Sequence, residues 1–285
     1  MPHWIKRTHL ALPALLVITA LAPAPAQSDT TTASIPLFTF RDGALAGGVM
    51  VAALFARRAD EHYARRLQDS STQANQKLQK LSMVVRRTVA PGSVIIGTTM
   101  YVTGRVAKNE RLAELGLYGT EALVAGELAA VVLKGMFGRQ RPYVTPQNSH
   151  SYDFLRGFTS GDQYRSFPSG HSLAAFAAAA AVTSQTSGWW PNSRWIIGPV
   201  LYGGAALTAV SRMYDNKHWA SDVIVGAGLG TFAGLKVVRY NNGNPGNRLD
   251  RWLLTGSIVP TESGGHAVRW SLLPGVSIGR SANAP

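Results

Sequence analysis

Cysteine is absent from this chain of 285 residues. The absence excludes disulfide bonds, thiolate metal sites, iron–sulfur clusters, a cysteine nucleophile and a lipid anchor carried on cysteine. Charged residues are scarce as well, at 15% of the sequence, and acidic residues are the scarcer sign, with 15 Asp and Glu against 28 Lys and Arg. Hydrophobic residues make up 46%, which is enough for a packed core and excludes global disorder.

The basic excess gives a formal charge of +13. Such a charge suits nucleic acid, anionic small molecules or anionic lipid. No zinc-finger, KH or RNP pattern accompanies it, so we expect no nucleic-acid partner. Many basic residues fall within 57–87 and alternate with acidic ones, which is typical of a solvated helical face.

The first 26 residues have the pattern of a secretory signal peptide. Lys6 and Arg7 precede the apolar run Leu10–Leu21, and Ala24-Pro25-Ala26 forms an Ala-x-Ala cleavage site. An uncleaved N-terminal anchor is the alternative. We therefore expect an exported, periplasmic protein in which 1–26 is the signal peptide and 27–42 is a flexible segment.

The rest of the chain divides into a helical domain at 43–240 and a tail at 241–285. Apolar periodicity predicts an all-α bundle of about six core helices. The tail opens on the breaker Asn241–Gly246 and has two short β-like runs that predict a hairpin around Glu262–Gly265. The expected helices are 43–56, 93–107, 111–139, 171–187, 195–210 and 221–239, with a helical run of mixed polarity at 59–89.

The apolar helices leave membrane insertion open. The helix at 111–133 contains Glu114, Glu121 and Glu127, which are costly in lipid unless they face a bundle interior. A soluble bundle with fully buried central helices also explains the runs, and the sequence favours it. An inner-membrane bundle with its site facing the periplasm is the alternative.

The first block of candidate site residues is Lys134–Pro142. If its helix continues to Pro142, Lys134 and Arg141 are two turns apart and share one face. Two cations at the end of an apolar helix would form an anion clamp. Basic side chains that neutralise a helix C-terminus are the alternative interpretation.

The second block is Ser166–His171, which precedes an alanine-rich helix. Ser169 and Gly170 are expected at the helix N-terminus, where free backbone N–H groups suit a phosphate oxygen. His171 can titrate and donate a proton there. A plain serine N-cap with a solvent-facing histidine explains this block equally well when it is taken alone.

The third block is Ser211–Asp222. His218 and Asp222 are four residues apart and would be neighbours on a helix, where the carboxylate would hold one imidazole nitrogen and leave the other free. Arg212 offers a planar fork for phosphate oxygens. A surface His–Asp pair is the alternative.

Taken together, the three blocks resemble the complete signature of the type 2 phosphatidic acid phosphatase (PAP2) family. The pattern is Lys-x6-Arg-Pro, then Pro-Ser-Gly-His, then Ser-Arg-x5-His-x3-Asp, and it spans Lys134–Asp222. That family includes exported bacterial acid phosphatases, lipid phosphate phosphatases and the vanadium haloperoxidases.

The resemblance implies a role for each matched residue. Lys134, Arg141 and Arg212 would bind phosphate oxygens together with the backbone of Ser169 and Gly170. His218 would attack phosphorus and become phosphohistidine, His171 would protonate the leaving group and then activate water, and Asp222 would orient His218.

The expected function is a metal-independent phosphatase that needs no cofactor and acts on a lipid or small-molecule phosphate monoester. The sequence shows no carboxylate cluster of the kind that holds Mg²⁺ or paired Zn²⁺. Contact with a membrane surface is expected, and the oligomeric state is left open. The alternatives are a vanadium-dependent haloperoxidase and a non-catalytic, membrane-associated bundle that binds anions.

Overall fold

We analysed a computed structural model of the chain, which describes residues 36–89, 92–244, 256–260 and 266–270. The expected signal peptide and cleavage site lie outside these residues. Within them the architecture is helical: α2 (Phe40–Arg57), α3 (Asp60–Leu67), α4 (Ser70–Gln73), α5 (Gln76–Val89), α6 (Gly92–Val106), α7 (Glu110–Phe137), α8 (Arg156–Thr159), α9 (Gly170–Trp189), α10 (Arg194–Tyr214) and α11 (Ala220–Gly243). The expected all-α bundle is confirmed.

Strands β1 (Gly256–Pro260) and β2 (His266–Trp270) form an antiparallel pair in the tail. Gly256 pairs with Trp270, and Pro260 pairs with His266. The two strands of the expected hairpin are therefore present and paired. The turn expected at Glu262–Gly265 lies outside the described residues.

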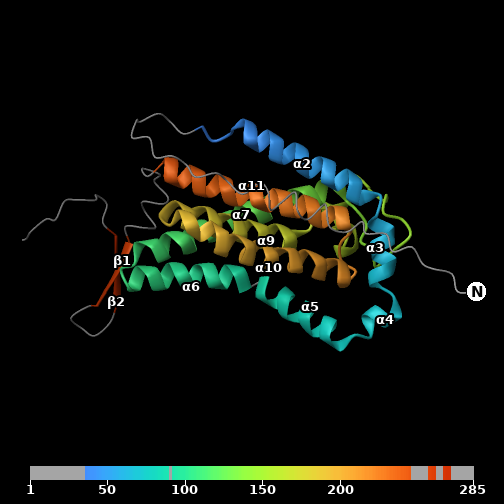
Figure 1. Cartoon of the computed structure of the whole chain (residues 1–285), viewed down its shortest axis with the longest axis horizontal. Helices are drawn as coiled ribbons and strands as arrows, with labels where there is room; N and C mark the ends of the chain where they lie inside the picture. Colours follow the sequence, from blue (N-terminus) through green and yellow to red (C-terminus); the bar gives the residue numbers. More distant parts are fainter. Residues whose placement is uncertain (1–35, 90–91, 245–255, 261–265, 271–285) are drawn as a thin grey trace, which may run out of the picture.

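Helix α9 occupies the centre of the bundle and packs against α7, α10 and α11 (Figure 1). Helix α11 can approach α9 closely because Gly226, Gly230 and Gly234 place a glycine every four residues along the contact. A Cβ atom at any of the three would collide with a backbone carbonyl of residues 169–177. This close packing holds the first turn of α9 against the first turn of α11.

Helices α3 and α4 lie at one end of the bundle, which α3 crosses, and α5 leads from that end along α10 toward α6 (Figure 1). The sequence predicted a single run at 59–89, but two caps divide it. The side chain of Asp69 accepts a hydrogen bond from Ser71 N at 3.1 Å and starts α4. The side chain of Asn75 accepts from Lys77 N at 3.0 Å and starts α5.

Helix α7 ends earlier than the sequence predicted. Gly138 adopts a left-handed conformation (φ 50°) and its N–H donates to Lys134 O at 3.2 Å, so the last helical residue is Phe137. The helix therefore does not continue to Pro142, and Arg141 does not share a helical face with Lys134. The segment that follows the cap brings Arg141 to the site instead.

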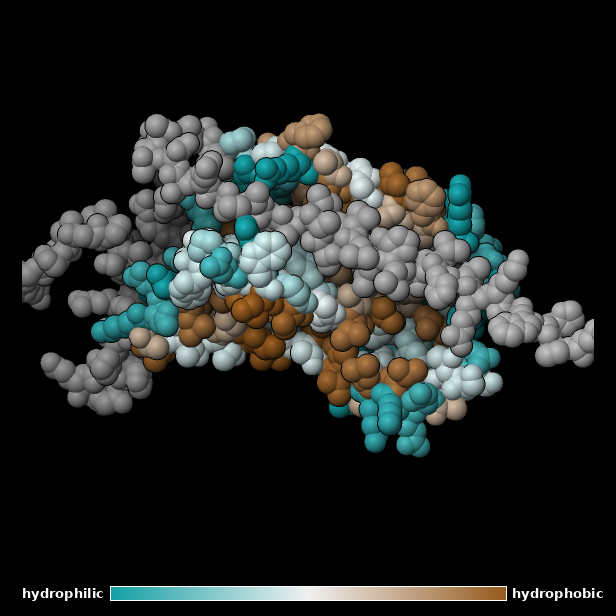
Figure 2. Space-filling view, in the orientation of Figure 1, coloured by the Kyte–Doolittle hydropathy of each residue, from teal (hydrophilic) through white to brown (hydrophobic). Residues whose placement is uncertain are grey.

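Within the described part of the chain, three helical segments are long and apolar enough to cross a membrane: Glu110–Phe137, Pro191–Tyr214 and Ala220–Gly243. The soluble bundle predicted from the sequence required these helices to be buried on all sides. They are not, because only 44%, 33% and 56% of their most apolar windows is buried. Apolar residues gather across the middle of the molecule and polar ones toward its ends (Figure 2). This distribution favours a membrane-embedded bundle over a soluble one.

Glu114 and Glu121 of α7 also fit a membrane-embedded bundle, because they pair with residues of neighbouring helices. Glu114 accepts a hydrogen bond from Gln185 at 3.3 Å, and Glu121 accepts one from Asn241 at 2.6 Å. The latter pairing continues α11 through Asn241, where the sequence predicted a break. Carboxylates that point inward and are paired are the kind that membrane helices tolerate.

Candidate active site

The predicted site residues come together at the end of the bundle that α3 crosses. The end of α7 contributes Lys134, the segment after it contributes Arg141, and α9 begins with the second block. Helix α10 ends and α11 begins at the third block. The fold thus brings three blocks that are separated in sequence to one place, as the phosphatase hypothesis requires.

His218 lies in the turn between α10 and α11, fully buried among site residues. Its Nδ1 atom is 2.7 Å from the backbone carbonyl oxygen of Ser166, so Nδ1 carries the proton and donates it. Its Nε2 atom is 3.4 Å from Nη1 of Arg141. The ring nitrogen with the free electron pair therefore faces a guanidinium group suited to phosphate oxygens.

The pKa of His218 is lowered to about 4: burial is the main cause, the positive charges of Arg141 and Lys134 act in the same direction, and Asp222 opposes the shift. The ring is consequently neutral at pH 7. A neutral imidazole is the form that can act as a nucleophile.

Asp222 approaches His218 without the helical geometry that the sequence suggested. Helix α11 begins at Ala220, so His218 precedes it and the two residues do not share a helical face. The carboxylate lies 3.8 Å from His218 Nδ1. Its nearer partners are Ser166 Oγ at 2.5 Å, Trp219 N at 3.0 Å and Arg139 Nη1 at 2.5 Å. Ser166 therefore contacts both members of the His–Asp pair: its hydroxyl group donates to Asp222, and its backbone carbonyl accepts from His218.

Arg139 and Asp60 form a buried network behind Asp222. The guanidinium group of Arg139 donates to Asp222, to Asp60 at 2.7 Å and to Ser149 O at 2.7 Å, and no part of its side chain is exposed. Asp60 also accepts from Ser221 N at 2.8 Å and from Ser221 Oγ at 2.6 Å. The first turn of α3 is thereby tied to the first turn of α11.

Three cations surround the two histidines, and each of them faces a carboxylate. Arg141 Nη2 contacts Asp162 at 2.7 Å, and Arg212 Nη1 contacts Asp215 at 2.7 Å. Lys134 interacts electrostatically with Glu127. The Nε atom of Arg212 is buried and lacks a hydrogen-bond partner among the described residues, so one donor is available for a ligand.

His171 lies beside this cluster at the start of α9. The charges of Arg212, Lys134 and Arg141 all act on it, as does His218. The helix begins at Gly170 with Ser169 as its N-cap, whose Oγ accepts from Ser172 N at 3.4 Å, as the sequence predicted. The first backbone N–H groups of α9 therefore lie next to the cations.

Sequence reasoning missed three residues that support the site: Asp60, Arg139 and Ser166. Arg139 and Ser166 belong to the first two blocks, and both have less than 1% of their surface exposed. Their closeness to the matched positions was the signal that could have identified them. Asp60 gave no such signal, because its partners Arg139 and Ser221 lie 79 and 161 positions further along the chain.

The arrangement combines a neutral imidazole, a second histidine, three cations and a helix N-terminus. Among residues 36–89, 92–244 and the two strands, no group of three His, Asp or Glu side chains gathers closely enough to hold a metal ion. The cluster can therefore hold a tetrahedral anion by its oxygens while a histidine nitrogen approaches the central atom.

Comparisons with known proteins find similar phosphatases. The model of the PAP2 superfamily matches residues 116–245, a range that contains every predicted site residue. The matched range is a little under half of the chain, and the family is the one that the three sequence blocks resemble. A transmembrane PAP2-type phosphatidylglycerolphosphate phosphatase from Bacillus subtilis has a similar fold, with a TM-score of 0.51 over 72% of this chain and 97% of that one, at 20% sequence identity.

Two curated relatives are similar to this chain over shorter ranges. A lipid A 1-phosphatase from Porphyromonas gingivalis is 37% identical over 89 residues, which is 30% of this chain and 19% of the relative. An undecaprenyl-diphosphatase from Sulfolobus acidocaldarius is 31% identical over 88 residues, 31% of this chain and 39% of the relative. The matched ranges thus span about a fifth and two fifths of these relatives.

Proposed function

We propose that this protein is a membrane-embedded phosphatase of the PAP2 superfamily that hydrolyses lipid phosphate monoesters. The observation that carries the proposal is the state of His218, whose Nδ1 donates to Ser166 O while Nε2 faces Arg141. An imidazole held in this tautomer beside cations is prepared to attack phosphorus. The names of the relatives and the apolar surface of the helices support a lipid as the substrate.

In the proposed reaction, Nε2 of His218 attacks phosphorus and the bond from phosphorus to the ester oxygen breaks. Burial and the surrounding cations lower the pKa of His171 to about 3. The negative charge of a bound phosphate ester offsets those cations, so His171 takes up a proton from solvent and gives it to the leaving oxygen. The neutral ring then takes a proton from the water that hydrolyses the phosphohistidine. Lys134, Arg141 and Arg212 stabilise the charge on the phosphoryl oxygens together with the N–H groups at Ser169 and Gly170. Asp222, 3.8 Å from Nδ1, stabilises the positive ring that forms on phosphorylation.

These side chains and N–H groups supply charge stabilisation for phosphoryl transfer, so we propose that the reaction needs no metal ion. The test is phosphate release from phosphatidic acid in nonionic detergent with excess EDTA. Wild-type protein should retain full activity, whereas complete loss in EDTA would refute metal independence. His218→Ala should release no phosphate, and His266→Ala, which changes a residue on β2, serves as the control. Turnover by His218→Ala would refute the nucleophile, and binding of lipid phosphate without turnover by the wild type would refute the phosphatase.

We also propose that the site end of the bundle faces the periplasm. The predicted signal peptide supports export, and the apolar helices support embedding in the inner membrane. In this arrangement a lipid substrate would reach the site from the outer leaflet.

A further inference from the structure

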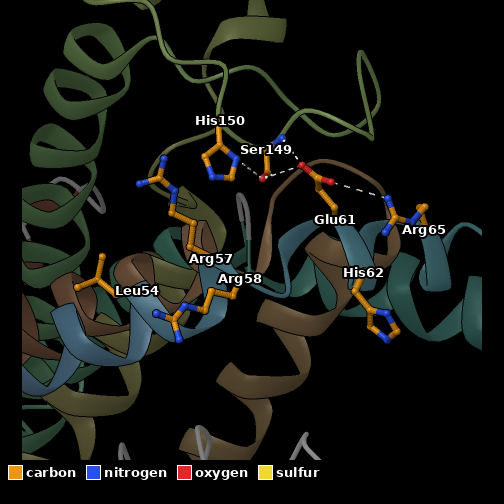
Figure 3. Close-up of a pocket in the computed structure, with 8 residues that line it drawn as sticks. All are labelled: Leu54, Arg57, Arg58, Glu61, His62, Arg65, Ser149 and His150. Carbon is orange, nitrogen blue, oxygen red and sulfur yellow. Dashed lines mark hydrogen bonds and ion pairs between the residues drawn. The ribbon is translucent and has the colours of Figure 1, made fainter.

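A basic pocket lies at the same end of the bundle as the candidate active site but outside it. Its volume is about 590 Å³, and Figure 3 shows the residues that line it: Leu54, Arg57, Arg58, Glu61, His62, Arg65, Ser149 and His150. They come from the end of α2, from α3 and from the segment between α7 and α8. None of these residues has a part in the proposed reaction.

The charge of this pocket favours an anion. Three arginines line it against one carboxylate, and Glu61 is already engaged by Ser149 N at 3.2 Å and by Arg65 at 3.7 Å. The Nε atom of Arg57 is buried and has no hydrogen-bond partner within the described part of the chain. A buried, charged donor without a partner is costly, and an anion in the pocket would satisfy it.

The pocket is backed by rigid structure. Tyr152 lies between two guanidinium groups, with Arg57 5.7 Å from its ring centre and Arg139 5.0 Å from it. Ser149 contributes its N–H to Glu61 and its carbonyl oxygen to Arg139. The pocket thus shares its wall with the buried network behind Asp222, which fixes the positions of the residues that line it.

The surroundings of the pocket point to a lipid as the source of the anion. Helix α2 leads to it with an exposed apolar face, in which Met50, Val51 and Phe55 have 61%, 53% and 65% of their surface exposed. Apolar residues lie over this end of α2 (Figure 2). An apolar helix that ends in arginines matches the order of a lipid, with acyl chains beside the helix and a phosphate at its end.

We propose that this pocket binds the phosphate headgroup of an anionic membrane lipid, separately from the phosphate that reacts. Arg57 and Arg58 bind the phosphate oxygens, Arg65 adds positive charge, and Leu54 contacts the start of the acyl chains. The binding is independent of turnover, so it stands or falls separately from the phosphatase proposal.

The test measures thermal stability of the full-length His218→Ala chain in nonionic detergent, with inorganic phosphate in excess to occupy the active-site cations. Dihexanoylphosphatidylglycerol should raise the Tm, because a ligand that binds only the folded state stabilises it. Dihexanoylphosphatidylcholine should not. Adding Arg57→Gln, Arg58→Gln and Arg65→Gln should weaken the apparent affinity for the anionic lipid by at least about tenfold, the equivalent of one charged hydrogen bond.

A matched control removes three positive charges from exposed positions of α5, with Lys77→Gln, Lys80→Gln and Arg87→Gln. This control should keep the wild-type response to the anionic lipid. If the Gln variant of the pocket fails to fold, Arg→Lys at the three pocket positions is measured instead, and it should keep most of the response because it keeps the positive charges. Equal responses in the pocket and α5 variants would overturn the proposal, as would an equal response to phosphatidylcholine. Loss of the lipid response only when phosphate is present would assign the pocket to free phosphate instead.

Discussion

The backbone carbonyl of Ser166 is 2.7 Å from Nδ1 of His218, whereas the carboxylate of Asp222 is 3.8 Å from the same atom. The carbonyl thus fixes the tautomer of the neutral ring, and the carboxylate is left to act through its charge. This division separates the orientation of the proposed nucleophile from the stabilisation of its phosphorylated form. The charge of Asp222 and the neutral form of His218 can therefore be tested separately.

Asp222→Asn should lower kcat by at least about 100-fold and leave KM nearly unchanged, because the charge matters only once the ring becomes positive. Steady-state kinetics with phosphatidic acid measure both constants. Asp153→Asn, which changes an exposed carboxylate on the loop before α8, is the control and should behave like the wild type. An increase in KM with kcat unchanged would contradict the role given to Asp222.

Asp60→Ala should destabilise the fold by about 3–5 kcal/mol, because it leaves Nη2 of Arg139 and the N–H and hydroxyl groups of Ser221 buried without the carboxylate that accepts from them. The side chains of Arg139 and Asp60 are both fully buried, so solvent does not screen the loss. Thermal unfolding in detergent measures the effect. Glu110→Ala, at an exposed position in the first turn of α7, should lower the Tm much less. Equal decreases in the two variants would show that the Asp60–Arg139 pair contributes no special stability.

The contrast between Asp222 and Asp60 shows what the sequence could predict. Asp222 belongs to a block with fixed spacing, so its closeness to His218 could be expected even though the helical reason for it was wrong. Asp60 reaches the site only because α3 crosses the end of the bundle, a tertiary arrangement that no local pattern encodes. For the same reason the sequence indicated Lys134 and Arg141 but not the cap at Gly138 that separates them.

The helices were predictable because apolar periodicity marks each of them, and their boundaries differ mainly where side chains make caps or long-range pairs. Asp69 and Asn75 divide the run at 59–89, and Asn241 extends α11 by pairing with Glu121. Which apolar faces lie outside was not predictable. Periodicity marks an apolar face without saying whether protein or lipid covers it.

His218 should remain neutral down to about pH 4. Its pKa in the folded protein lies below the ordinary value of 6.5, mainly because burial disfavours the charged ring. Protonation therefore begins at a lower pH than for an exposed histidine, and the nucleophilic form persists between pH 6.5 and pH 4. An NMR titration of ¹⁵N-histidine-labelled protein measures this directly, with His218→Gln to assign the signal. A transition near pH 6.5 for that signal would contradict the burial argument.

The absence of cysteine makes the proposed orientation in the membrane directly measurable. Thr159→Cys introduces a thiol at the site end of the bundle, and Asn192→Cys introduces one at the opposite end, each at an exposed position. If the site faces the periplasm, a membrane-impermeant maleimide should label the first variant in spheroplasts and the second only after lysis. The reverse pattern would place the site in the cytoplasm, and labelling of both variants before lysis would contradict a bundle that spans the membrane. Wild-type protein carries no thiol, so every labelled band comes from the introduced residue.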